Sequence, residues 1–372
     1  MTIEATGTKL EETRPATAGR APVAAPIVNT TCIDPLSDPA WDRLAAAHPE
    51  FTFFHSSAWA KVLHSTYGHE PVYQRFYRGD QLAAMLPMME VRSALTGRRG
   101  VCLPFTDSCG PLYFGSNEPS QAIMDHLVRT SRDRSWKYFE VRGKGAHLPD
   151  ANPSVSFYNH ILGLRSNPDD LFDQFASPVR RAIRKAEQHG LVAEISTDLE
   201  ALLEFYRLHV ATRKRHGLPP QPISFFRNIH EHVLKARLGF VVLARHHSRA
   251  VAGAVFFHAG KKAIYKFGAS DPSHLELRGN NLTMWQAIKT LAQRGFETLD
   301  FGRTSLANEG LRRFKLSWAV EEKIVDYSKF DTARQAWVTS RDKASGFHNA
   351  IFRALPVPLN RLASALLYPH LD

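Results

Sequence analysis

Residues 265–318 hold a strand–loop–helix–strand pattern, which constrains the fold more than any other part of the chain. The apolar run Tyr265–Ala269 ends in a loop that is rich in turn residues. Apolar residues then recur three or four positions apart, which predicts one buried helix face; they are Leu282, Trp285, Ile288 and Ala292. Gly295 suits the left-handed residue that closes a helix, and Glu297–Phe301 is predicted to be the next strand.

The start of this helix is a candidate binding site. Asn280 or Asn281 can cap it, and the unpaired N–H groups of a first helical turn attract an anion or a carbonyl oxygen. The strand that follows delivers Asp300 to its end, directly before Gly302 and Arg303.

The residues after this strand resemble the Fem-type (FemAB-like) branch of the GNAT acyltransferase superfamily. In that branch a D-F-G-R-S strand end is followed by G-L, then F-K, then a tryptophan. The chain has Asp300-Phe301-Gly302-Arg303-Thr304-Ser305, then Gly310-Leu311, Phe314-Lys315 and Trp318. Thr304 replaces the usual serine, and Ala319 stands where a glycine often follows the tryptophan.

Three further blocks resemble the same family and lie in its order. They are residues 101–112 (VCLPFTDSCGPL), the basic helix at 177–190 and the segment 205–226. The resemblance covers roughly residues 40–330. It implies an α/β (α+β) fold of two tandem GNAT-like domains, each a mixed sheet flanked by helices, with a groove between them.

These patterns predict four parts of the chain: a disordered tail over 1–30, an N-terminal GNAT-like domain over 31–165, a C-terminal GNAT-like catalytic domain over 166–330 and a helical tail over 331–372. In the first domain we expect a helical region over 40–67, strands over Val72–Tyr77 and Gln81–Met89, and a helix over Gln121–Arg134.

Charge and cysteine content narrow the partners and the compartment. The formal charge is +11 and the pI is near 9.6. This balance suits an anionic partner, such as nucleic acid, a nucleotide-linked sugar, coenzyme phosphates or an anionic membrane, although it can also serve solubility alone. Three cysteines without paired zinc spacing argue against a disulfide framework and a metal site. With no apolar run of membrane-spanning length and no secretory signal, we expect a cytoplasmic protein, with peripheral contact at the inner membrane face left open.

Acyl transfer to an amine requires removal of a proton, polarisation of the acyl carbonyl and alignment of both groups. The resemblance implies that Lys315 stabilises the oxyanion. Asp300 or Asp107 would handle the proton, although either carboxylate could instead cap a turn. Without a G-x-S-x-G elbow or a signalled Cys/His pair, direct transfer is the simpler prediction.

Substrate-binding residues are expected around these three. One side of the 177–190 helix is cationic, which suits phosphates, although a charged face is commonly just solvated. The predicted set is Phe314, Arg303, Arg180, Arg181, Arg184, Lys185, Arg213, Tyr265, Asn280 and Asn281.

The predicted function is transfer of an acyl or aminoacyl group to an amino group of a cell-envelope or exopolysaccharide precursor. Acyl-CoA or aminoacyl-tRNA remains open as the donor, and an anionic or lipid-linked sugar is the expected acceptor. The alternative is a catalytically silent protein that binds a polysaccharide precursor or RNA. The sequence leaves the oligomeric state open.

The C-terminal residues 347–366 are apolar at near-helical spacing and include Arg353 and Arg361, with prolines at 356 and 358. Such a stripe either packs on the second domain or lies on an anionic membrane.

Overall fold

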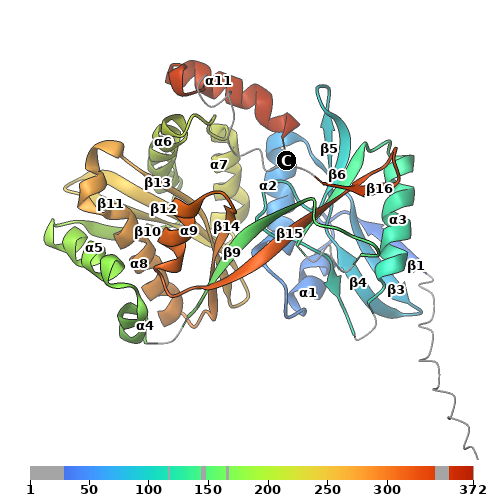
Figure 1. The fold of residues 1–372 in the computed structure, drawn as a ribbon, viewed down its shortest axis with the longest axis horizontal. Coiled ribbons are helices and arrows are strands. Elements are labelled where there is room, and N and C mark those ends of the chain that lie inside the picture. The colour runs from blue at the N-terminus through green and yellow to red at the C-terminus, as the bar shows by residue number, and fades with distance from the viewer. Residues whose placement is uncertain (1–28, 116–117, 144–147, 165–166, 340–351, 372) are drawn as a thin grey trace, which may run out of the picture.

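The computed structural model describes residues 29–115, 118–143, 148–164, 167–339 and 352–371. Figure 1 shows two α/β halves side by side, with the C-terminal helix lying across their upper side. Most of the predicted disordered tail, residues 1–28, lies outside the described residues.

The N-terminal half combines short strands with three α-helices. Its elements are β1 (Asn29–Ile33), α1 (Ala40–Ala46), η1 (Phe53–His55), α2 (Ser57–Tyr67), β2 (Glu70–Pro71), β3 (Tyr73–Arg78), β4 (Gln81–Leu86), β5 (Met89–Ser93), β6 (Gly97–Val101), β7 (Leu112–Tyr113), α3 (Ser120–Asp133) and β8 (Tyr138–Arg142).

Prolines explain two departures from the predicted elements in this half. The helical region predicted over 40–67 is two α-helices, because Pro49 lies between them and lacks the N–H that a continuous helix needs. The strand predicted over Gln81–Met89 is divided in the same way. Pro87 separates β4 from β5, and the two strands lie in different sheets.

The C-terminal half contains the basic helix and the strand–loop–helix–strand order that the sequence predicts, whereas a short strand, Ala336–Val338, lies in the tail that was predicted to be helical. Its elements are β9 (Val155–Gly163), α4 (Pro168–Gln174), α5 (Ser177–Gln188), β10 (Val192–Ser196), α6 (Leu199–Arg215), α7 (Ile223–Ile229), η3 (His230–Leu234), β11 (Gly239–His246), β12 (Arg249–Ala259), β13 (Lys262–Ser270), η4 (Pro272–Leu277), α8 (Gly279–Gln293), β14 (Thr298–Ser305), α9 (Glu309–Leu316), β15 (Glu321–Asp331), β16 (Ala336–Val338), α11 (Val357–Leu367) and η5 (Tyr368–His370).

One long sheet runs through both halves in the order β10-β11-β12-β13-β14-β9-β15-β8-β6-β5-β2, with β16 beside β15. Strand β15 joins the halves, because it pairs with β9 over Glu321–Tyr327 and with β8 over Tyr327–Asp331. A second sheet has the order β1-β3-β4-β7. Figure 1 shows β9 and β15 crossing together through the middle of the molecule.

Close packing fixes where α8 begins. A Cβ on Gly279 would lie 2.8 Å from the Ala252 Cβ on β12, so only glycine allows the helix to start this close to the sheet. The apolar face predicted for this helix is buried, including Leu282, Trp285 and Ile288. The start of α8 is therefore held rigidly at the edge of a packed core.

Candidate active site

The site forms where β13 and β14 stop pairing. The two parallel strands are paired over Lys262–Ile264 and Thr298–Asp300, and both continue beyond those residues. Each then has an irregular register: β13 at Lys266 against β12, and β14 between Asp300 and Arg303 against β9. Bulges of this kind bend a strand and redirect its side chains and carbonyl groups.

Gly302 makes the bulge in β14 possible. Its φ is 72°, in the left-handed region that glycine adopts without strain. An added Cβ would lie 3.3 Å from the Asp107 carboxyl group, so this position also lacks room for a side chain. The bulge therefore brings a loop of the N-terminal half against a strand of the C-terminal half.

The carbonyl groups of this bulge hold Lys315, which is 3% exposed at the end of α9. Its Nζ donates to the Gly302 oxygen at 2.6 Å and to the Arg303 oxygen at 3.1 Å. Burial lowers the pKa of Lys315 from its usual 10.5 to about 8, opposed by the charges of Asp107 and Asp300. Two of the three ammonium N–H bonds are thus committed to backbone, which leaves one for a substrate oxygen.

Asp300 lies beside this lysine at the start of the bulge. It accepts the Gly302 N–H at 2.7 Å and a side-chain N–H of Asn159 at 3.1 Å. Burial nevertheless raises the pKa of Asp300 from its usual 3.8 to about 6, because desolvation outweighs these two hydrogen bonds. A carboxylate with this pKa can accept a proton near neutral pH.

Asp107 meets the same cluster from the N-terminal half. Its Oδ2 lies 2.8 Å from the Nζ of Lys266, which the β13 bulge directs inward. Burial raises the pKa of Asp107, but Lys266, Arg303 and Lys315 together bring it below its usual value. Asp107 is therefore the carboxylate that stays ionised, whereas Asp300 titrates near neutrality.

Aromatic side chains fix Arg303 next to these groups. Its guanidinium stacks on Phe157 at 4.4 Å and on Tyr327 at 5.0 Å from the ring centroids. The Tyr327 hydroxyl in turn donates to the Asp107 carbonyl oxygen at 2.8 Å. Strands β9, β14 and β15 and the loop of Asp107 thus form one connected unit.

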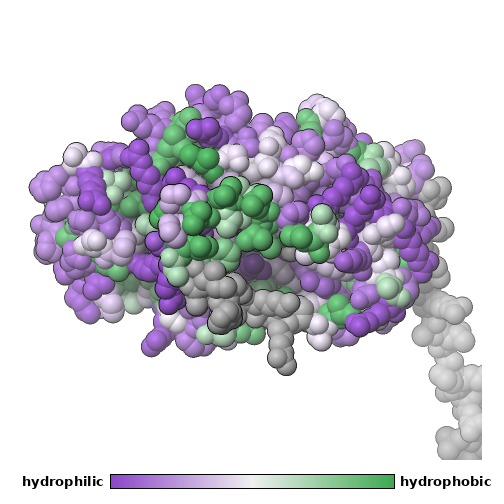
Figure 2. Space-filling view, turned by 90° about the horizontal axis from the view of Figure 1, so that it is seen from above, coloured by the Kyte–Doolittle hydropathy of each residue, from purple (hydrophilic) through white to green (hydrophobic). Residues whose placement is uncertain are grey.

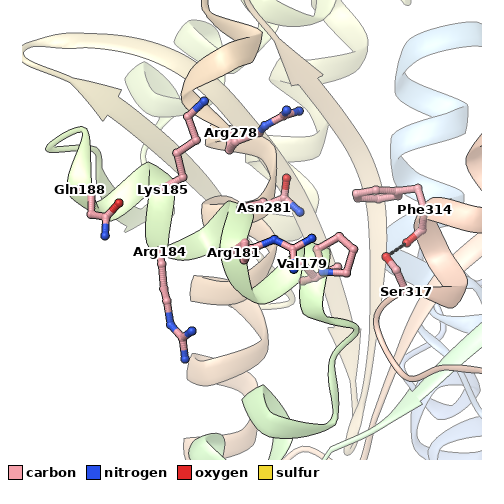
Figure 3. Close-up of a pocket in the computed structure, with 11 residues that line it drawn as sticks. Val179, Arg181, Arg184, Lys185, Gln188, Arg278, Asn281, Phe314 and Ser317 are labelled. Atoms are coloured by element: carbon pink, nitrogen blue, oxygen red, sulfur yellow. Dashed lines mark hydrogen bonds between the residues drawn. The ribbon is translucent and has the colours of Figure 1, made fainter.

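A cation-lined cavity of about 740 Å³ borders α9, and Phe314, the residue before Lys315, is part of its lining. It is bordered by α5, the start of α8 and the Phe314 and Ser317 side of α9. Figure 3 shows Asn281 between Arg278 and Arg181, with Phe314 across from them. Its lining residues are Pro178, Val179, Arg181, Ala182, Arg184, Lys185, Gln188, Arg278, Asn281, Phe314 and Ser317. Four cations beside a helix N-terminus suit a phosphate-bearing ligand.

The structure brings together most of the residues predicted from the sequence. Lys315, Asp300, Asp107 and Arg303 form the buried cluster, and the cavity is lined by Arg181, Arg184, Lys185, Asn281 and Phe314.

Four predicted substrate-binding residues lie outside both the buried cluster and the lining of this cavity. Arg180 lies in the first turn of α5, where its Nη1 is 3.6 Å from the Oδ1 of Asp173 on α4. Arg213 donates to the Pro219 carbonyl oxygen and to the Tyr368 hydroxyl, so it holds the C-terminal segment. The Tyr265 hydroxyl lies over Gly268 on its own strand, and Asn280 is exposed on α8.

Lys266, Arg278 and Asn159 belong to the site and were not predicted from the sequence. Lys266 could have been found from the sequence, because it is a charged residue within the otherwise uncharged run Tyr265–Ala269. Arg278 could have been found from its place directly before the glycine that begins α8. Asn159 carried no such signal, because β9 joins β14 only through the tertiary fold.

In the part of the chain that the structure describes, no group of three or more His, Cys, Asp or Glu side chains could hold a metal ion. Among the same residues, no helix is both long and apolar enough to cross a membrane.

Comparison with known proteins defines the class. Residues 174–316, which include α5, α8, Asp300 and Lys315, match the acetyltransferase (GNAT) domain family. This part of the chain is therefore a GNAT acetyltransferase domain, which places the protein among the acyltransferases. No curated protein matches the sequence.

Within that class the fold is shared with FemX, at 17% identity and a TM-score of 0.65 over 80% of this chain and 97% of FemX. A tandem GNAT protein from the clavulanic acid biosynthesis pathway matches at 9% identity and a TM-score of 0.50, over 82% of this chain and 98% of that one. The C-terminal domain of a protein described as a lysylphosphatidylglycerol synthetase, from Agrobacterium fabrum, matches at 13% identity and a TM-score of 0.50, over 80% and 91%. The predicted fold of two tandem GNAT-like domains is confirmed.

Proposed function

We propose that this protein transfers an acyl or aminoacyl group directly to an amino group of a cell-envelope or exopolysaccharide precursor. The observation that carries the proposal is the buried pair of Lys315 and Asp300 at the β14 bulge, next to a cationic cavity of about 740 Å³ that Phe314 helps to line. The fold and the GNAT domain support acyl transfer in general. The acceptor class rests on the resemblance of the sequence to the Fem-type branch.

The cavity would hold the donor through its phosphates, with Arg181, Lys185 and Arg278 as the cations and α8 offering N–H groups. An acyl-CoA suits this arrangement, because its diphosphate can bind the cations while its thioester extends past Phe314 toward Lys315. Aminoacyl-tRNA is the alternative donor, whose terminal phosphates would use the same cations.

The cluster supplies the remaining chemistry. Asp300 would take the proton from the attacking ammonium, and the amine nitrogen would form the new bond to the carbonyl carbon. The remaining N–H of Lys315 would stabilise the oxyanion. The bond from the carbonyl carbon to the donor sulfur or oxygen then breaks, and that leaving group takes the second proton from the amine nitrogen. Asp107 stays ionised and, with Arg303, suits an acceptor that carries hydroxyl and phosphate groups.

Replacement of Lys315 by Met tests this assignment. Lys315→Met should lower turnover by about a hundredfold or more, the usual effect of one oxyanion-stabilising group. Turnover is measured as release of the coenzyme A thiol from acetyl-CoA with an amino-sugar acceptor, and in parallel with aminoacyl-tRNA. Lys323→Met is the matched control, because this lysine is 56% exposed and lies on β15.

Donor affinity distinguishes an enzyme from a silent binding protein. If Lys315→Met loses turnover and still binds the donor, the protein is an enzyme and Lys315 acts in the transfer step. Tight ligand binding without turnover in the wild-type protein, with either donor, would instead support a binding protein. Mass spectrometry of a co-purified ligand identifies the donor, because coenzyme A and tRNA differ greatly in mass.

A further inference from the structure

Helix α11 presents its polar side to the protein and its apolar side to solvent. Asn360, Ser364 and Tyr368 follow each other four positions apart and are 2%, 0% and 4% exposed. Leu359, Leu362 and Leu366 occupy the opposite side and are 53%, 59% and 64% exposed. A helix that only packed on the domain would show the reverse arrangement, because burying leucine is what stabilises such packing.

Specific polar contacts fix this orientation. Ser364 donates to the Pro220 carbonyl oxygen, and the Tyr368 hydroxyl donates to the Pro219 carbonyl oxygen at 3.1 Å. Arg213 donates to that same hydroxyl at 3.0 Å. Exposure of the three leucines is thus built into the fold rather than left to a loosely attached helix.

The exposed leucines lie on one broad side of the molecule. Figure 1 shows α11 on the outside of α6 and α7, with the β5–β6 hairpin rising on the same side. Figure 2 views this side and shows apolar side chains gathered over its centre and bordered by hydrophilic ones. The tip of the hairpin carries Leu95, which is 70% exposed. We call Leu359, Leu362 and Leu366 the leucine face, with Leu95 as a separate apolar point.

Cations accompany the leucine face. Arg361 is exposed on α11, with its guanidinium 5.2 Å from the Tyr206 ring centroid. Arg353 is also exposed and lies close enough to His216 to contribute to lowering its pKa. Arg215 at the end of α6 is exposed and acts on the same histidine. Apolar side chains flanked by arginines are the combination that anionic lipid surfaces attract.

We infer that the leucine face binds the surface of an anionic membrane, with Arg353 on the lipid headgroups and Leu95 as a second point of insertion. An anionic membrane is the partner that charge complementarity favours, because exposed arginines accompany the leucines and the whole chain carries a formal charge of +11. Phe347 and Ile351, which belong to the stripe predicted from the sequence, lie outside the described residues. Membrane binding would bring the enzyme to a lipid-linked acceptor. That role rests on the proposed function, whereas membrane binding itself is independent of it.

Flotation of the full chain with vesicles tests the inference. The protein should float with phosphatidylcholine vesicles that contain phosphatidylglycerol, and less with phosphatidylcholine alone or at high salt. The double variant Leu362→Glu/Leu366→Glu should bind at least about tenfold more weakly, because charged side chains cannot enter the lipid. Val192→Glu/Leu275→Glu, at exposed apolar positions on β10 and η4, should float like the wild-type protein.

Two results would overturn the inference: failure of the wild-type chain to float, or equal flotation of the leucine-face variant. If the wild-type chain fails to float and is a dimer that the variant converts to a monomer, the partner is a second copy and not a membrane. Should the glutamate variant unfold, Leu366→Trp replaces it, and an unchanged tryptophan emission on addition of anionic vesicles would count against membrane contact. Lys315→Met should float normally, so failure of the transfer chemistry is distinguishable from failure of membrane binding.

Discussion

Burial of a lysine ammonium costs free energy, and the surroundings of Lys315 show how this chain offsets that cost. Two carbonyl groups accept its hydrogens, and two carboxylates lie near enough to favour its charge. These groups do not fully compensate for lost water, so the pKa falls to about 8. Asp300 is shifted in the opposite direction by the same cause. The two shifts bring both groups into the range in which an acid and a base work at neutral pH.

These pKa values predict a bell-shaped dependence of kcat/KM on pH. Activity should rise as the pH passes through about 6, where Asp300 becomes able to accept a proton. It should fall above about pH 8, where Lys315 loses its charge. Asp300→Asn should remove most activity, and its residual rate should lack the acidic limb. A profile without a limb near either value would remove the corresponding residue from the mechanism.

The same shift of Asp300 affects folding. The folded state binds the Asp300 proton more tightly than the unfolded state does. Protonated Asp300 therefore stabilises the fold below about pH 4, and this contribution is lost as the pH rises through about 6. Asp300→Asn should therefore flatten the fall in unfolding free energy across this interval, as measured by urea unfolding at several pH values.

Ala319 occupies a backbone conformation that suits glycine, with a φ of 58°. Ala319→Gly should raise the unfolding free energy by about 1 kcal/mol or less, because relief of left-handed strain exceeds the added entropy of the unfolded chain. Ala211→Gly on the exposed side of α6 is the control, and it should lower stability by a similar amount. Destabilisation by both substitutions would show that Ala319 is not strained.

Helix α5 divides its cations between two roles, although they are adjacent in the sequence. Arg181, Arg184 and Lys185 line the cavity, whereas Arg180 lies near Asp173 and outside the lining. The buried residues Ile183 and Ala186, which are outside the cavity lining, lie on the side of α5 that packs in the core, and α5 contacts α8. Packing on α8 thus decides which arginines face the cavity.

Adjacent arginines on α5 allow a matched comparison. Arg181→Ala should weaken binding of acetyl-CoA or of another phosphate-bearing donor by about tenfold, and the loss should shrink at high salt. Arg180→Ala removes the same charge one residue away and should have a much smaller effect. Titration calorimetry of both variants checks this. Equal losses would indicate a general charge effect and not a cavity contact.

Over the whole molecule, two features connect parts that are distant in the sequence. Strand β15 pairs with strands of both halves. The C-terminal segment crosses back over the N-terminal half, where Tyr368 stacks on Tyr67. The ring centroids of Tyr368 and Phe105 are 5.8 Å apart, and Phe105 is two residues before Asp107. The tail is therefore part of the packing that supports the site, whatever binds its outer face.

Tyr368 and Leu366 separate these two roles of the tail. Tyr368→Ala should lower the unfolding free energy by about 3 kcal/mol or more, since it removes a buried aromatic ring and its hydrogen bonds. Leu366→Ala should leave the unfolding free energy nearly unchanged, because its side chain is 64% exposed. Thermal and urea unfolding check both. Little destabilisation by Tyr368→Ala would mean that the tail does not support the fold.

The sequence by itself determined the elements and the types of residue in the site. Helical periodicity predicted α8 with its buried face, and the resemblance pointed to Lys315, Asp300 and Asp107 before any contact was known. The buried face of α8 and the three site residues could be predicted because each depends only on local residue spacing or on a short motif. Pro49 and Pro87 were also visible, and their effect on neighbouring elements follows from the missing N–H.

Tertiary structure alone decided how these residues act. Lys266 reaches Asp107 only because a bulge in β13 turns it inward, and Asn159 reaches Asp300 only because β9 pairs with β14. Arg213 carries the positive charge that a phosphate ligand would need, yet packing directs it to Tyr368. The pKa values of Asp300 and Lys315 depend on burial and on charges from distant parts of the chain. Desolvation and long-range pairing are properties of the packed molecule, so no local pattern of residues can specify them.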